Sequence, residues 1–156
     1  EGAVRSLRFG EGGRSWWLIP LLLLVGLNGC HRDSVSLEVR DAWVRPILPV
    51  QSVTAAYFDL RNLGPDTVRV TAALSPAFEV VEMHEMATDG EGVMRMRRLA
   101  SITIAPGETV QLKPGGKHLM LIGPKHKMSV GNDVSILLET GTGDVVSLAA
   151  RVDRRL

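Results

Sequence analysis

Residues 83–128 read MHEMATDGEGVMRMRRLASITIAPGETVQLKPGGKHLMLIGPKHKM, and this stretch indicates the class of fold. Its short extended runs are separated by turn-forming clusters: TDGEG at 88–92, PG at 106–107 and PGG at 114–116. No run shows a sustained helical period. The stretch therefore predicts β-strands joined by tight turns, with 88–92 closing a hairpin.

The same pattern continues on both sides of this stretch. The expected strands are 36–39, 42–44, 53–60, 67–74, 78–86, 93–99, 101–104, 108–112, 117–122, 134–140 and 144–152. Many short strands with regularly spaced turns predict an all-β sandwich or barrel, and we expect it to occupy residues 37–156. A domain of this size buries a workable core without disulfides or metal, so the metal-free protein should be folded.

Residues 1–29 have the pattern of a signal peptide. Basic residues precede an apolar run at 16–27, which is too short to span a bilayer comfortably. The run ends in Leu-Asn-Gly-Cys, which resembles a bacterial lipobox with Cys30 as the lipidated residue. Residues 30–36 are then a tether, and the mature protein is exported to the periplasm and anchored to a membrane. The alternative is an ordinary secretory signal followed by a chance cysteine.

Charge and cysteine content exclude several functions. The net charge of +1 and the absence of a basic run argue against a nucleic-acid surface. Cys30 is the only cysteine, so no internal disulfide is possible. We expect no enzyme, because neither a Ser/His/Asp or Cys/His pairing nor a phosphate-binding glycine loop is present.

Soft metal donors are concentrated in residues 83–128. This stretch holds three of the four histidines, His84, His118 and His126, and all six methionines: Met83, Met86, Met94, Met96, Met120 and Met128. Thioethers are soft donors and imidazole suits copper, so a cluster without thiolate points to Cu(I). An oxidising compartment threatens thiol ligands and also favours methionine. A blue-copper electron carrier is disfavoured, because its site needs a cysteine.

Alternation along the strands groups these donors. His118 and Met120 share one face of a strand, as His84 and Met86 do, and as Met94 and Met96 do.

A hairpin closed by 88–92 can bring His84 close to Met96, and a third strand can add His118 and Met120 to complete a set of two imidazoles and two thioethers. The alternative is that the methionines fill the core and that the domain is a β-sandwich interaction module without metal.

The spacing of these residues resembles a known signature. From His84, one residue and ten more lead to Met96, and twenty-one more lead to His118-Leu119-Met120. This resembles the signature of the PCu(A)C family of periplasmic copper chaperones. The segments DAWVR, AAYF, VMRMR and KPGGKHLML also read like blocks of that family. The likeness covers residues 37–148, although Glu85 stands where the family has an optional methionine.

The resemblance implies a cupredoxin-like Greek-key β-sandwich with an exposed Cu(I) site. It implies that His84, Met96, His118 and Met120 are the ligands. It also implies a chaperone that delivers copper to the binuclear copper site of a cytochrome c oxidase subunit, alone or with a Sco-type thiol protein. Periplasmic copper buffering or resistance without an oxidase client is the alternative.

Four further donors have weaker roles in this interpretation. Met86 and Met94 form an outer shell of the copper site. His126 and Met128 either form a weak second site or belong to a solvated loop. Glu85 should point away from His84, so its departure from the family pattern removes no ligand.

Overall fold

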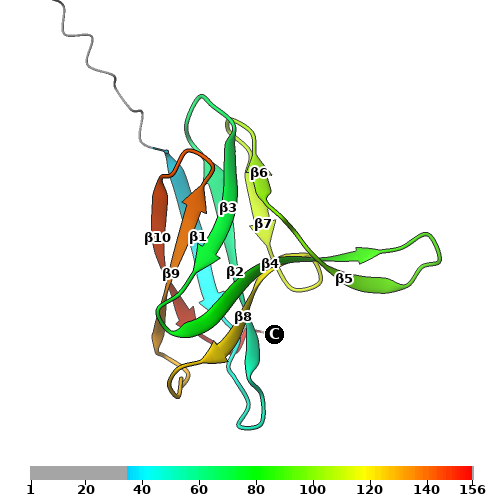
Figure 1. The fold of residues 1–156 in the computed structure, drawn as a ribbon, viewed down its shortest axis with the longest axis vertical. Coiled ribbons are helices and arrows are strands. Elements are labelled where there is room, and N and C mark those ends of the chain that lie inside the picture. The colour runs from blue at the N-terminus through cyan, green and yellow to red at the C-terminus, as the bar shows by residue number, and fades with distance from the viewer. Residues whose placement is uncertain (1–34, 156) are drawn as a thin grey trace, which may run out of the picture. The chain divides into compact units, whose positions relative to one another are not determined.

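The computed structural model describes residues 35–155, which form ten β-strands and no helix (Figure 1). The strands are β1 (Leu37–Val44), β2 (Val53–Asn62), β3 (Val68–Leu74), β4 (Phe78–Thr88), β5 (Met94–Arg98), β6 (Ile102–Ile104), β7 (Thr109–Leu112), β8 (Lys117–Pro124), β9 (Asp133–Thr140) and β10 (Val145–Val152). The all-β prediction is confirmed. The expected signal peptide at 1–29 and Cys30 lie outside the described residues.

Strand β1 differs from the expectation, because the two runs expected at 36–39 and 42–44 form one strand. Its pairing with β2 is irregular between Arg40 and Trp43, where Asp41 has a φ of 54°. Aspartate adopts this left-handed conformation more readily than most residues do. The polar break in the sequence is therefore an irregularity within one strand.

The strands are hydrogen-bonded in the order β5-β4-β8-β7-β2-β1-β10-β9-β3-β6, and β8 also pairs with β2. The pairs β1–β10 and β7–β8 are parallel. Every strand except β5 sends alternate side chains into one core, among them Phe58, Leu121 and Ile136. The sheet thus curves around a single apolar interior, as the alternating pattern predicts.

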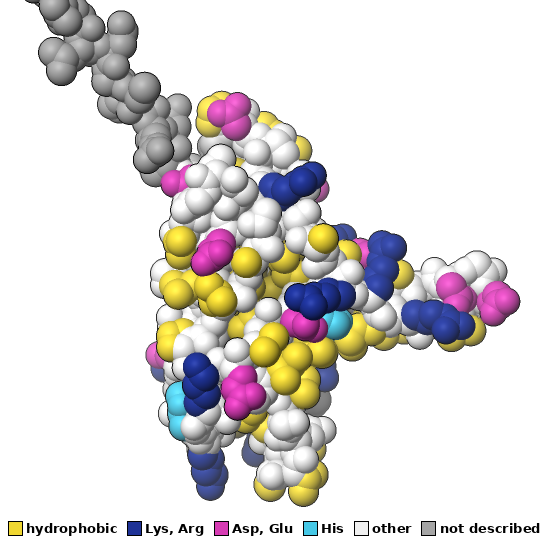
Figure 2. Space-filling model, viewed as in Figure 1, with side chains coloured by type: hydrophobic (Ala, Val, Ile, Leu, Met, Phe, Trp, Pro, Cys, Tyr) yellow, Lys and Arg dark blue, Asp and Glu magenta, His cyan; other side chains and the backbone are white. Residues whose placement is uncertain are grey.

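The hairpin of β4 and β5 projects from this body as an arm (Figure 1). All five residues of β5 are exposed. Hydrophobic side chains follow one edge of the arm and charged side chains follow the other (Figure 2). At its tip the carboxylate of Asp89 accepts hydrogen bonds from the backbone N–H groups of Glu91 and Val93, at 3.0 and 2.9 Å. Gly92, with a φ of 79°, supplies the left-handed residue that the turn needs.

Candidate metal centre

Four rings form a row across neighbouring strands, on the sheet face that points away from the core. They are Trp43 on β1, Tyr57 on β2, His118 on β8 and His84 on β4, with successive centroids 4.6, 6.3 and 6.0 Å apart. His84 and His118 are directly opposed in the β4–β8 pairing. All four side chains are buried. The row holds the two imidazoles together at the base of the arm.

The hydrogen bonding of His84 leaves one ring nitrogen without a partner. Its Nε2 lies 2.8 Å from Oε2 of Glu82, and a carboxylate only accepts, so Nε2 carries the proton in this contact. Nδ1 is buried and has no hydrogen-bond partner among the described residues. In the neutral ring this nitrogen holds a lone pair. A buried and unpartnered lone pair is suited to bind a metal ion.

Glu82 is itself fixed by a second contact. Its Oε1 lies 3.0 Å from Nη1 of Arg98. The hydrogen bond from His84 lowers the pKa of Glu82, and the charge of Arg98 contributes further. Glu82 therefore remains an ionised acceptor and favours the His84 tautomer in which Nδ1 is free, as carboxylates do behind metal-binding histidines. Glu82 was not among the residues predicted for the site, although its position two residues before His84 places both on one face of the strand.

His118 presents the other ring nitrogen. Its Nδ1 donates to the carbonyl of Gly116, 3.0 Å away, which leaves Nε2 with the lone pair in the neutral ring. A tight turn sets this geometry: the N–H of Lys113 donates to the carbonyl of Lys117 at 2.8 Å, and Gly115 has a φ of 76°. The two histidines thus have free lone pairs on different nitrogens.

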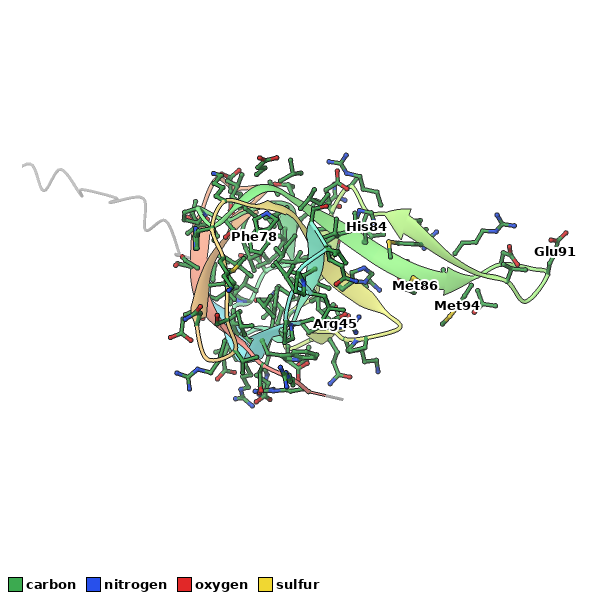
Figure 3. All side chains as sticks on the ribbon, turned by 90° about the horizontal axis from the view of Figure 1, so that it is seen from below. Arg45, Phe78, His84, Met86, Glu91 and Met94 are labelled. Atoms are coloured by element: carbon green, nitrogen blue, oxygen red, sulfur yellow. The ribbon has the colours of Figure 1, made fainter. Side chains whose placement is uncertain are left out.

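Three thioethers lie beside the imidazoles. Met120 is two residues from His118 on the same face of β8, while Met86 on β4 is opposed to Met96 on β5. All three line a cleft of about 650 Å³ together with His118. Figure 3 shows His84 at the base of the arm and Met86 farther out along it.

The register of the hairpin places Arg98, and not Met96, opposite His84. A turn centred on Gly90 would instead set Met96 opposite His84. The contacts of Asp89 shift the centre of the turn from Gly90 to Glu91. Met96 is consequently a diagonal neighbour of His84, a distance that long side chains still reach.

The opposite face of the arm carries a charged brace. The carboxylate of Glu85 lies 2.9 Å from Nζ of Lys117 and 2.6 Å from Nη2 of Arg97. The hydrogen bond from Lys117 lowers the pKa of Glu85 most, and the hydrogen bond from Arg97 lowers it further. Glu85 therefore joins β4, β5 and β8 behind the site, and its position agrees with the expectation that it points away from His84.

The remaining donors lie elsewhere. Met94 is opposed to Thr88 nearer the tip of the arm and does not line the cleft. His126 is exposed in the loop after β8, whereas Met128 packs against the core. His126 and Met128 therefore lie in different surroundings, and the structure does not bring them together as a second site.

The chemistry of the donors fits a soft, monovalent ion. Within residues 35–155 no group of three or more His, Cys, Asp or Glu side chains is arranged to hold a metal. The site instead offers two imidazoles and neighbouring thioethers, a set that suits Cu(I). The same part of the chain contains no helix of the length and apolarity needed to cross a membrane.

Comparisons with known proteins agree with the fold and the sequence signature. Residues 37–152 match the family described as "Putative lipoprotein LpqE-like". The chain is 29% identical over 141 residues to a protein named putative lipoprotein Lxx21020 of Leifsonia xyli subsp. xyli, covering 83% of this chain and 84% of that protein.

Two solved structures are similar to the whole β domain. The copper-bound PCuAC domain from PmoF2 has a TM-score of 0.65 at 22% identity, over 78% of this chain and 97% of that one. The solution structure of CuI-DR1885 from Deinococcus radiodurans has a TM-score of 0.61 at 26% identity, over 81% of this chain and 85% of that one. The predicted resemblance to the PCu(A)C family and the predicted fold class are confirmed.

Proposed function

This chain belongs to the putative lipoprotein LpqE-like family, and we propose that it is a copper chaperone that carries one Cu(I) ion where β4, β5 and β8 meet. One observation carries the proposal: the buried Nδ1 of His84 has no hydrogen-bond partner among residues 35–155, and the neighbouring His118 lines a cleft with three thioethers. Two of the similar structures are named as copper-bound, which supports the same cargo. The role is transport and not catalysis.

The proposed ligands are His84 through Nδ1, His118 through Nε2, Met96 and Met120. The hydrogen bonds to Glu82 and to the Gly116 carbonyl favour these nitrogens, since each occupies the other side of its ring. Met86 is close enough in the register to exchange with Met96, because the two are directly opposed. Such an alternative thioether suits a site that must release its ion.

Release is a ligand exchange in which copper remains Cu(I). The neutral imidazoles and thioethers leave the ion without taking up a proton. If the acceptor binds through thiols, each thiol loses its proton to solvent as it binds. Because thioethers have no proton to lose, binding by this chain depends little on pH wherever the imidazoles are neutral.

We propose the binuclear copper site of a cytochrome c oxidase subunit as the destination, reached directly or with a Sco-type thiol protein. The resemblance to the PCu(A)C family supports this client. A lipid on Cys30 would hold the chaperone at the outer side of a membrane that contains the oxidase. The lipoprotein name of the Leifsonia relative supports such an anchor.

Transfer tests the client. The protein carrying Cys30→Ser is loaded anaerobically with Cu(I) and mixed with the apo, reduced copper domain of oxidase subunit II from the same organism. We expect the acceptor to gain copper, with the His118→Ala variant delivering none. Retention of all copper by the chaperone would indicate a buffering protein and reject the oxidase as client.

A further inference from the structure

We propose that the cleft beside the copper site docks an acidic segment of the copper-receiving protein, with Arg45 and Arg154 as the groups that bind it. This inference rests on the proposed chaperone function. It concerns the charge of the partner's surface, which the copper ligands themselves do not determine.

The cleft is open and largely apolar. It lies between the loop that joins β1 to β2 and the β4–β5 arm. Its exposed apolar side chains come from both sides: Leu48 is 58% exposed, Val53 40% and Met96 51%. Because three thioethers also line it, an acceptor that takes copper from Met96 or Met120 must enter this cleft.

Two arginines give the cleft a positive charge. Arg45 follows β1 and its guanidinium lies 5.6 Å from the ring centroid of Tyr57. Arg154 follows β10, which runs parallel to β1. Both are exposed and line the cleft, and none of the lining residues is acidic.

The neighbouring acids are already engaged. On the arm, Glu82 pairs with Arg98, Glu85 with Arg97 and Lys117, and Asp89 with Arg95. No carboxylate among residues 35–155 lies within ion-pair distance of Arg45 or Arg154. Six other arginines have such partners: Arg40, Arg95, Arg97, Arg98, Arg151 and Arg155. These two arginines of the cleft, Arg45 and Arg154, are therefore available to pair with carboxylates of a partner protein.

Complementary charge mainly accelerates and orients an encounter. Exposed charge pairs add little affinity, but they raise association rates and make them depend on salt. The apolar walls then exclude water from the thioethers and the incoming ligands. A partner with carboxylates flanking its copper ligands would pair with the two arginines while its copper ligands lie between the apolar walls.

Two synthetic acceptor peptides test this. Both carry two cysteines separated by three residues, and they differ only in having glutamates or glutamines on either side. Copper transfer from the loaded Cys30→Ser protein is followed anaerobically by stopped flow, at about 0.02 M and about 0.5 M salt. Competition with a Cu(I) chelator first establishes that the chaperone binds copper and gives the affinity of each peptide.

We expect the glutamate peptide to take copper about tenfold faster than the glutamine peptide at low salt, and the ratio to approach one at high salt. Arg45→Glu and Arg154→Glu should each abolish this preference with the Cu(I) affinity unchanged, and Arg45→Lys should keep it. Arg69→Glu, an equal charge change at an exposed arginine of β3 outside the cleft, should also keep it.

Equal rates for the two peptides at low salt would overturn the docking proposal, as would a preference that survives both cleft variants. If the cleft variants lose binding to vesicles of anionic phosphatidylglycerol and the peptides show no preference, the arginines face a membrane and the proposal is also wrong. Absence of Cu(I) binding in the first step is a separate result, because it rejects the chaperone function itself.

Discussion

Met86 on β4 and Met96 on β5 are directly opposed, whereas the residue opposed to His84 is Arg98. The register thus places two thioethers, and not an imidazole and a thioether, face to face across the arm. Both line the cleft with His118 and Met120, while Met94 lies nearer the tip and does not. The methionines of the arm are therefore not equivalent.

Met96→Leu should weaken Cu(I) binding by about tenfold or more, because leucine fills the same space without a soft donor. Met86→Leu should have a smaller effect, since Met96 remains. Met94→Leu is the matched control: Met94 lies on the same face of β5 and is similarly exposed, at 58% against 51%. Titration against a Cu(I) chelator measures all three, and equal losses for Met94 and Met96 would contradict the assignment.

Glu82→Gln should weaken Cu(I) binding by about tenfold to a hundredfold, the range found when a carboxylate behind a metal-binding histidine is lost. Nitrogen chemical shifts of the His84 ring provide a second readout. In the copper-free protein we expect the proton on Nε2, and in the variant a mixture of tautomers.

The control for this substitution is Glu85→Gln, on the same strand but on the opposite face. It should loosen the arm and leave the His84 tautomer unchanged. If Glu82→Gln also left both the tautomer and the affinity unchanged, Glu82 would have no positioning role.

Alternation and turn residues predict the strands except for β1, which was expected as two separate runs. Proline and glycine clusters such as 106–107 and 114–116 do end strands where expected. The break expected between 39 and 42 was wrong, because Asp41 adopts a left-handed conformation and β1 continues through an irregularity. The register of the hairpin depends on hydrogen bonds to the Asp89 carboxylate, which the pattern of residues does not specify.

For the proposed site, the sequence predicts a set of donors but not their geometry. Strand alternation groups His84 with Met86 and His118 with Met120. It does not specify which ring nitrogen is free, since that depends on Glu82 and on the Gly116 carbonyl.

Asp89 should control the order of the arm. Hydrogen bonds from Arg95 and from the N–H of Val93 lower its pKa. Because the folded pKa is below the unfolded value, the stabilisation is complete above the ordinary value of about 3.9 and is lost as pH falls through the folded value.

Hydrogen exchange of the Val93 amide measures this effect. Its protection should fall in Asp89→Ala at neutral pH, and in the unmodified protein as the pH falls below the ordinary aspartate pKa and through the lower folded value. The amide of Gly143, in the turn between β9 and β10, is the internal reference for the neutral-pH variant comparison. Unchanged protection of Val93 in Asp89→Ala would show that the turn does not depend on this side chain.

Replacing Cys30 with Ser should move the protein from the membrane fraction to the soluble periplasmic fraction, because the thiol is the proposed site of the lipid. Fractionation with an antibody measures the distribution. A Ser34→Ala variant in the expected tether should remain with the membrane. Continued membrane association of Cys30→Ser would reject lipidation as the anchor.

The decisive measurement is an anaerobic titration of the Cys30→Ser protein with Cu(I) in competition with a chelator, because this variant contains no thiol. We expect one tightly bound Cu(I) per chain, with binding greatly weakened in His84→Ala and in Met120→Ala while both variants remain folded. Binding that is absent from the parent protein, or that is equally tight in both folded variants, would contradict the proposed copper site.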